Sequence, residues 1–127
     1  MSQIIDHVGL RVSDFERARD FYREALGTLG IELLAEFAHG RERHAGFGKG
    51  HPTFWISTGA IKRGDSHVAF TAASRAEVEA FWSVAKSMGG IDNGAPGIRA
   101  QYHPNYYGAF VFDPDGNNVE AVCHGEQ

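Results

Sequence analysis

The sequence repeats itself at an offset of 60 residues, and this repeat constrains the fold more than any other feature. The offset aligns HVGLRV (7–12) with HVAFTA (67–72), and six positions are identical between the two stretches that begin there. Each stretch has the pattern of a strand, then a helix, then glycines that end the helix. The repeat therefore predicts a single domain over residues 1–127, built from module one (about 1–60) and module two (about 64–124).

In module one, residues 4–12 alternate between two faces, as a half-buried strand does. Ser13 and Glu16 form a capping-box pattern, which predicts that a helix begins there, and apolar residues recur at helical spacing as far as Leu29. We expect the helix to cover one face of the strand and to leave the other face free. The covered face contains Val8, Leu10 and Val12, and the free face contains His7, Gly9 and Arg11.

Module two repeats this order, with a strand over 67–73 and a helix that begins at the capping-box pair Ser74 and Glu77. Three short strands are expected after each helix, and the Gly- and Pro-rich stretch 92–97 is expected to be a loop. The pattern is an α+β fold with the order β-α-β-β-β given twice. The expected later strands are 31–37, 44–48 and 53–58 in module one, and 98–103, 107–113 and 118–123 in module two.

Composition excludes several classes of partner. Twelve Lys and Arg against sixteen Asp and Glu give a net charge of −4, without a basic cluster, so neither nucleic acid nor an anionic membrane surface is expected to bind. No apolar run approaches the length of a membrane span, and the start of the chain lacks the pattern of a secretion signal. The single cysteine, Cys123, fits a reducing compartment, which favours the cytoplasm.

Three potential metal ligands lie on free faces of the predicted strands. His7 and His67 occupy equivalent places in the two modules, and Glu120 lies in a Val-rich strand where a carboxylate is costly to bury without a partner. Two imidazoles and a carboxylate suit a divalent transition metal. Spacing alone leaves a second interpretation open, in which both histidines are ordinary interior or surface residues and the carboxylate is solvated.

The other histidines carry weaker signals. His39, His44 and His51 fall in a Gly-rich polar stretch and are expected to be loop residues, and His124 is close to the end of the chain. His103 lies within QYHPNYYG, where aromatic neighbours make it a candidate for contact with a ligand.

The segments HVGLRVSDFERARDFYREALG and FVFDPDGNNVEAV resemble the vicinal oxygen chelate superfamily, which includes glyoxalase I, extradiol dioxygenases, fosfomycin-resistance proteins and bleomycin-binding proteins. The resemblance covers nearly the whole chain. It implies a glyoxalase-like fold whose two modules form a cup-shaped open barrel, with a divalent metal at the base of the cup. The ligands it implies are His7, His67 and Glu120, and the metal could be Zn, Mn, Fe, Co or Ni.

The chain departs from individual branches of this superfamily. Glyoxalase I has a fourth ligand in module one, and an alignment of Gly50 with Gly116 puts Phe54 at the place that corresponds to Glu120. Neither Phe54 nor its neighbours are carboxylates, which puts the four-ligand form of glyoxalase I in doubt. Phe110 stands where extradiol dioxygenases have a tyrosine, and no monovalent-cation loop of the fosfomycin-resistance type is found. Bleomycin-binding members lack the metal ligands that this chain retains.

The resemblance implies a metal-dependent enzyme that binds a small compound through two neighbouring oxygens, with lyase, isomerase or dioxygenase chemistry and Glu120 at the reacting centre. The alternative is a metal-free protein of the bleomycin-resistance type that binds or sequesters a planar ligand between two protomers. A homodimer is expected, because each four-stranded sheet leaves an edge strand. The expected substrate contacts are Arg11, Phe47, Trp55, Arg99, Tyr102, His103, Tyr107 and Phe110, with Tyr106 in the same aromatic wall.

Overall fold

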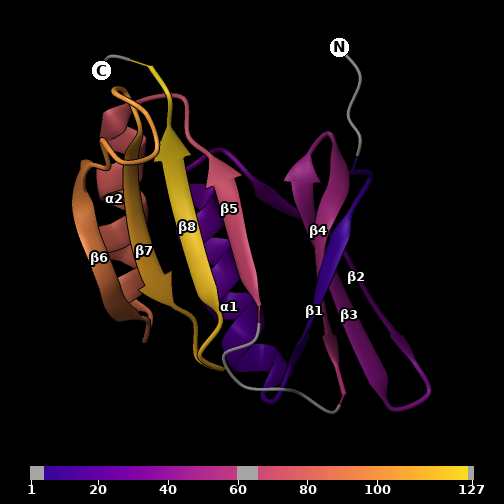
Figure 1. Ribbon diagram of the computed structural model, residues 1–127. Helices are drawn as coiled ribbons and strands as arrows, with labels where there is room; N and C mark the ends of the chain where they lie inside the picture. Colours follow the sequence, from indigo (N-terminus) through magenta and orange to yellow (C-terminus); the bar gives the residue numbers. More distant parts are fainter. Residues whose placement is uncertain (1–4, 60–65, 126–127) are drawn as a thin grey trace.

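The computed structural model describes residues 5–59 and 66–125, which form two four-stranded sheets, each with a helix on one face (Figure 1). Module one contains β1 (Val8–Val12), α1 (Phe15–Gly27), β2 (Glu32–His39), β3 (Glu42–Lys49) and β4 (His51–Thr58). Module two contains β5 (His67–Thr71), α2 (Arg75–Ser87), β6 (Ile91–Ile98), β7 (Tyr107–Phe112) and β8 (Asn118–Cys123). The predicted α+β class and the doubled β-α-β-β-β order are confirmed.

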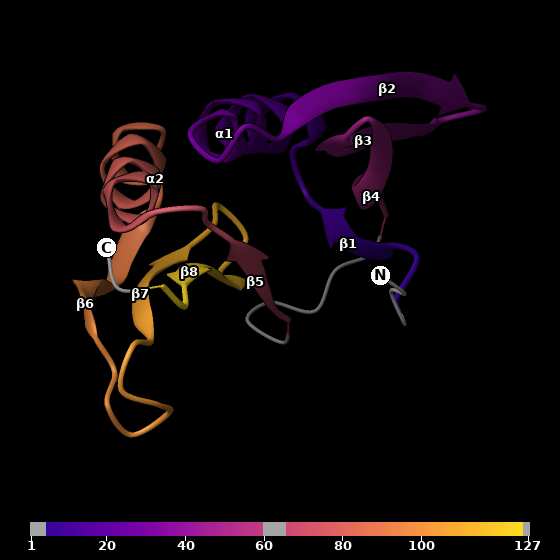
Figure 2. The same ribbon diagram turned by 90° about the horizontal axis from the view of Figure 1, so that it is seen from above.

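The two sheets have the same topology. Sheet 1 has the strand order β1-β4-β3-β2 and sheet 2 the order β5-β8-β7-β6, and in each the first strand is parallel to the last strand of its module. β1 and β5 therefore lie at the edges of their sheets. Figure 2 shows that the two helices lie side by side, while the sheets splay apart and do not close into a barrel within one chain. The faces turned away from the helices remain open.

The core lies between the helices and the sheets and continues from one module to the other. Phe54 of sheet 1 contacts Phe70 of sheet 2 edge-on, with ring centroids 5.1 Å apart. Gly90, just after α2, allows a close approach, because a Cβ there would lie 2.5 Å from Val111 Cγ1 and 3.0 Å from Phe21 Cε1. A glycine is thus needed where α1 of module one meets β7 of module two.

The start of α1 differs from the prediction. Its N-cap is Asp14, whose carboxylate accepts a hydrogen bond of 3.2 Å from the backbone N–H of Arg17, rather than Ser13. In α2 the N-cap is Ser74, as predicted, and its hydroxyl accepts from the N–H of Glu77. Asp14 and Ser74 are 60 residues apart, so the caps follow the repeat, and Ser13 is free for another contact.

The strand expected at 98–103 is also wrong. β6 occupies Ile91–Ile98, so the stretch 92–97, expected to be a loop, lies within it. Its pairing with β7 shifts register on both sides of Gly94. β6 is an edge strand that needs hydrogen-bond partners on one side only, and this allows glycine and Pro96 within it. The 60-residue repeat points to this placement, because β2 lies at the equivalent position of module one.

A buried carboxylate joins the two modules at the turn between β7 and β8. Asp113 accepts hydrogen bonds from the backbone N–H groups of Asp115 and Asn117, from the Asn117 side chain, and from the Tyr22 hydroxyl of α1 at 2.5 Å. The neighbouring Asp115 accepts from the backbone N–H and the hydroxyl of Ser13. These four groups all donate to the Asp113 carboxylate, so the buried carboxylate is well satisfied. The bond to Tyr22 fixes α1 against module two.

Within the described residues, neither helix is long and apolar enough to cross a membrane.

We predict that Tyr22→Phe lowers the free energy of unfolding by about 1–3 kcal/mol, because it leaves a buried carboxylate oxygen with one donor fewer. Urea denaturation at pH 7 measures this change. Tyr107→Phe is the matched control, because it also removes one tyrosine-to-carboxylate hydrogen bond, to Glu79, but at the exposed surface. Its effect should be below about 0.5 kcal/mol. Equal losses in the two variants would contradict the structural role of Asp113.

The hydrogen bond between Tyr22 and Asp113 also makes the stability of the protein depend on pH in the alkaline range. Burial, and then the charge of Asp113, raise the pKa of Tyr22 well above its ordinary value. The folded protein holds this phenol protonated, so its contribution is complete below about pH 10, the pKa in the unfolded chain, and declines as pH rises beyond that. Between pH 10 and 11 the wild type should lose up to about 1.4 kcal/mol more than Tyr22→Phe. Urea titrations in which the free energy of unfolding falls equally with pH in the wild type and in Tyr22→Phe would exclude this linkage.

Candidate metal centre and substrate pocket

Glu120 lies in the middle of β8 on the open face of sheet 2, and its side chain is only 1% exposed. The pairing of β5 with β8 brings His67 beside it, with 3.2 Å between His67 Nε2 and Glu120 Oε1. The hydroxyl of Tyr106 donates a hydrogen bond to the other oxygen, Oε2. The structure therefore brings together two of the three predicted ligands and adds a phenol that orients the carboxylate.

The hydrogen bonding of His67 indicates which ring nitrogen is free. Its Nδ1 lies 3.2 Å from the backbone carbonyl of Asn118, which can only accept, so Nδ1 carries the proton and donates it. In the neutral ring, Nε2 then presents a lone pair to the Glu120 carboxylate. Two acceptors face each other at this distance only if a cation or a proton lies between them. A ligating histidine that donates its second N–H to a carbonyl is the usual arrangement at a metal.

Tyr106 belongs to the segment just before β7, and its phenol is held neutral. Burial, and then the hydrogen bond to Glu120, raise the pKa of Tyr106 above its ordinary value. The space in front of this group is a cavity of about 400 Å³, here named the sheet 2 pocket. It is lined by His67, Tyr102, Tyr106, Phe110, Asn118 and Glu120.

His7, the third predicted ligand, lies on the other sheet, just before β1. Its Nδ1 donates to the carboxylate of Asp6 at 2.7 Å, and this hydrogen bond lowers the pKa of Asp6. In the neutral ring, Nε2 is again the free nitrogen, as in His67. Across residues 5–59 and 66–125, however, no group of three potential ligands lies close enough to hold a metal within one chain.

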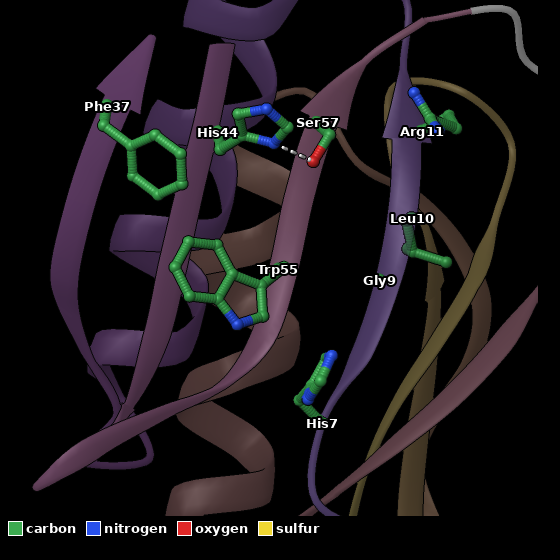
Figure 3. A pocket seen from close by; sticks show the side chains of 8 residues that line it. All are labelled: His7, Gly9, Leu10, Arg11, Phe37, His44, Trp55 and Ser57. Carbon is green, nitrogen blue, oxygen red and sulfur yellow. Dashed lines mark hydrogen bonds between the residues drawn. The ribbon is translucent and has the colours of Figure 1, made fainter. Parts of the chain in front are cut away.

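The open face of sheet 1 carries a second cavity, of about 440 Å³, here named the sheet 1 pocket. Figure 3 shows Trp55 at its centre, His7 at one end, and His44 and Ser57 at the other, joined by a hydrogen bond of 2.7 Å. The Phe37 ring stacks on His44 and lies edge-on to Trp55. The full lining is His7, Gly9, Leu10, Arg11, Phe37, His44, Trp55 and Ser57.

A family model described as the Glyoxalase/Bleomycin resistance protein/Dioxygenase superfamily matches residues 4–121. The chain belongs to this superfamily. A search of curated proteins finds no significant match. The superfamily includes enzymes such as glyoxalase I and fosfomycin resistance proteins, so metal-dependent chemistry is within its range.

Solved structures support the same assignment. A glyoxalase/bleomycin resistance protein from Albidiferax ferrireducens is 30% identical, with a TM-score of 0.80, over 95% of this chain and 99% of that chain. Glyoxalase I from Zea mays is 23% identical, with a TM-score of 0.70, over 93% of this chain and 43% of that chain. A fosfomycin resistance protein from Listeria monocytogenes is 19% identical, with a TM-score of 0.68, over 97% of this chain and 94% of that chain. The last two similarities concern the fold.

Strand register corrects one detail of the superfamily comparison. Val8 pairs with Phe54 in sheet 1, and its equivalent Val68 pairs with Val119 in sheet 2. Trp55, rather than Phe54, therefore corresponds to Glu120. The alignment through glycines was off by one residue, because Gly50 alone joins β3 to β4 whereas residues 113–117 join β7 to β8. The conclusion is unchanged, since tryptophan cannot supply a fourth ligand.

The predicted substrate contacts divide into three groups. Arg11 and Trp55 line the sheet 1 pocket, and Tyr102 and Phe110 line the sheet 2 pocket. Arg99 lies beside the sheet 2 pocket, with its guanidinium 5.3 Å from the centroid of the Phe110 ring. The remaining three, Phe47, Tyr107 and His103, line neither pocket.

Phe47 and Tyr107 face the helices. Phe47 is fully buried against Tyr22 and Phe54, because it lies on the covered face of β3. Tyr107 donates to Glu79 of α2. The aromatic residue type suggested a pocket wall, but strand phase decides which face a side chain occupies.

His103 stacks on His124 and forms a hydrogen bond with it, beside the ring of Tyr106. Its Nδ1 accepts from the backbone N–H of Asn105, so His103 stabilises the segment before β7.

Five lining residues of the sheet 1 pocket were not predicted as site residues, namely Gly9, Leu10, Phe37, His44 and Ser57. His44, expected in a loop, lies in β3, while Phe37 and Ser57 lie in β2 and β4. His39 and His51 also fall within strands, at the end of β2 and the start of β4. A strand over 44–48 was predicted and is confirmed by β3, and the period-two spacing of His44, Gly46 and Gly48 within it was a usable signal that His44 shares their face.

We predict that Tyr106→Phe lowers the free energy of unfolding by about 1–3 kcal/mol, because the buried Glu120 loses a donor. Tyr102→Phe is the matched control: this tyrosine lies in the same segment, is 60% exposed, and has no hydroxyl partner among the described residues. Its effect should stay below about 0.5 kcal/mol. Thermal and urea unfolding of metal-free protein measure both. A Tyr106→Phe variant as stable as Tyr102→Phe would contradict the assigned contact.

Proposed function

We propose that the protein is a metal-dependent enzyme of the lyase, isomerase or dioxygenase kind, acting on a small substrate that binds through two neighbouring oxygens. The observation that supports this most is the pair of His67 Nε2 and Glu120 Oε1, 3.2 Å apart, with the other histidine nitrogen already bonded to Asn118. The donor set fits a divalent ion such as Zn, Mn, Fe, Co or Ni.

We propose His7 of a second chain as the third ligand. β1 and β5 each lie at one edge of their sheet, with His7 directly before β1 and His67 at the start of β5. In a homodimer that sets β1 of one protomer beside β5 of its partner, the open faces of sheet 1 and sheet 2 would together form one cup. In both histidines Nδ1 is hydrogen-bonded to another group, so Nε2 is the nitrogen that would bind a shared ion.

When bound, the ion would act as a Lewis acid toward the substrate oxygens. Glu120 would hold the ion from a buried position, at the reacting centre. Tyr106 would keep one carboxylate oxygen oriented, and Phe110 and Tyr102 would exclude water from the sheet 2 side of the cup. The single cysteine agrees with a reducing compartment, and we propose a cytoplasmic location.

A second candidate is a metal-free protein that binds a planar ligand. The sheet 1 pocket favours it, because its aromatic lining of Trp55 and Phe37 is complete within one chain. Metal content separates the two candidates.

We predict that protein freed of metal with a chelator binds one divalent ion per chain and gains thermal stability, since an ion bound only to the native state must stabilise it. His7→Ala, His67→Ala and Glu120→Ala should each abolish the gain, whereas His39→Ala, at the far end of β2, should not. Calorimetric titration with Zn²⁺, Mn²⁺, Fe²⁺, Co²⁺ and Ni²⁺ provides the measurement. Failure of all five ions to bind would exclude the metal enzyme and favour the metal-free candidate.

Mixing variants tests the sharing of the site. A heterodimer of one His7→Ala chain and one His67→Ala chain contains one site with all three native ligands, so it should bind one ion although neither parent homodimer binds any. A site confined to one chain would gain nothing from mixing. Light scattering that finds only monomers would also contradict the shared site.

A further inference from the structure

We propose that His103, His124 and Gly108 are positioning residues for the metal centre. They hold the Tyr106 phenol on Glu120, and through it they decide which carboxylate oxygen is left for an ion. This inference deepens the proposed function and rests on it for the metal. The contacts themselves lie within module two of one chain, so they can also be tested in metal-free protein.

Tyr106 belongs to the segment 99–106, which joins β6 to β7. Backbone hydrogen bonds close this segment on itself: the N–H of Arg99 donates to the carbonyl of Tyr106 at 2.7 Å, and the N–H of Tyr106 donates to the carbonyl of His103 at 3.2 Å. These bonds fix the backbone of Tyr106. The direction of its side chain is a separate choice among rotamers, and the groups that pack against the ring decide it.

Two histidines, here named the histidine clasp (His103 and His124), hold the segment to the end of β8. The N–H of Asn105 donates to His103 Nδ1 at 3.0 Å, so in the neutral ring the proton lies on Nε2. His103 Nε2 then donates to His124 Nδ1 at 2.5 Å. Both imidazoles lie nearly perpendicular to the Tyr106 ring, with centroids 5.5 and 5.3 Å from it. The histidine clasp therefore forms a wall against the phenol.

Gly108 provides the space through which the phenol reaches its partner. It lies on β7, where it pairs with Val122 of β8. A Cβ at Gly108 would lie 3.2 Å from Tyr106 Cε1 and 3.3 Å from Glu120 Oε2, which is tighter than most real contacts. Gly108 is not among the glycines of positive φ, so a glycine is needed here for space and not for backbone conformation.

The phenol assigns different partners to the two oxygens of Glu120. Tyr106 donates to Oε2, while Oε1 lies 3.2 Å from His67 Nε2. Without the phenol the carboxylate could rotate about its last bond, and an ion would have to order it on binding. Outer partners of this kind typically change the affinity of a site for its metal about 10- to 100-fold. The residues that hold Tyr106 should therefore affect metal affinity although none of them touches the ion.

Matched variants of His124 test the histidine clasp. His124→Ala should raise the Kd for Zn²⁺ about tenfold, and Tyr106→Phe at least as much. His124→Asn should restore the wild-type Kd, because its amide oxygen is as many bonds from Cα as Nδ1 and can accept from His103. His39→Ala, which removes an exposed histidine at the end of β2, should have no effect. A folded His124→Ala variant with the wild-type Kd would overturn the proposal.

Gly108→Ala tests the space beneath the phenol. The added methyl group should displace the ring and raise the Kd for Zn²⁺ about tenfold. Gly27→Ala is the matched control, since a Cβ there meets nothing within 4 Å. Circular dichroism verifies that each variant is folded. Equal affinity of the two alanine variants would remove Gly108 from the positioning residues.

Double variants show whether the clasp and Gly108 act through Tyr106. In the Tyr106→Phe background, His124→Ala and Gly108→Ala should leave the Kd for Zn²⁺ unchanged, because the hydroxyl that they position is already absent. A merely structural role would weaken the site in either background. If the fold-changes of the single variants multiply in full, the positioning role is overturned.

Hydrogen exchange in chelator-treated protein separates this inference from the proposed function. His124→Ala should speed the exchange of amides in 99–106, and His124→Asn should not. If the wild type binds no Zn²⁺ but exchange behaves in this way, and His124→Ala shifts the urea midpoint less in Tyr106→Phe than in the wild type, the positioning of Tyr106 on Glu120 stands and the metal enzyme does not. Unchanged exchange in His124→Ala would overturn the clasp, whatever the metal affinity.

Discussion

The buried carboxylate of Asp113 is the contact on which the arrangement of the molecule depends. It closes the turn that leads into β8, and through the Tyr22 hydroxyl it holds α1 of module one against module two. The same turn sets the register of β8, and therefore the position of Glu120 beside His67. Asp113, in the turn before β8, thus positions Glu120, which lies on the open face of sheet 2. Both are buried, but the partners of Asp113 come from both modules of one chain, whereas Glu120 lies beside His67 and Tyr106 on the open face of sheet 2.

The two modules share a topology but present different chemistry. Sheet 2 has a carboxylate, Glu120, that contacts both an imidazole and a phenol. Sheet 1 has a tryptophan at the position that corresponds to Glu120, flanked by glycines, with an arginine and a histidine in the next row. In the proposed dimer these faces meet, so one module would supply the reacting centre and the other an aromatic surface beside it. The superfamily fold is kept in both, and the difference lies in the side chains of the open faces.

Most of the fold could be predicted from the sequence, because amphipathic helices and alternating strands leave periodic signals. The doubled order and both helices follow from period and repeat. Strand alternation places His67 and Glu120 on free faces, but their pairing was expected only from the superfamily resemblance, because strand pairing leaves no local signal. β6 could not be predicted from local composition, since its glycines and proline are tolerated only because it is an edge strand. Phe47 and Tyr107 were placed in the pocket because they are aromatic, yet the phase of β3 and β7 turns them to the helices. The hydrogen bond between Tyr22 and Asp113 joins residues 91 positions apart, and nothing local in the sequence encodes it.

The glycine beside Trp55 has a consequence for how such a protein changes its ligands over evolutionary time. Gly46 lies beneath the indole, and a single methyl group at this position would force the ring off the strand. The shape of the binding surface is thus encoded on β3 as much as on β4, which carries the aromatic ring. A lineage could thus reshape this pocket through one small substitution on β3, while every residue that lines the pocket stayed the same.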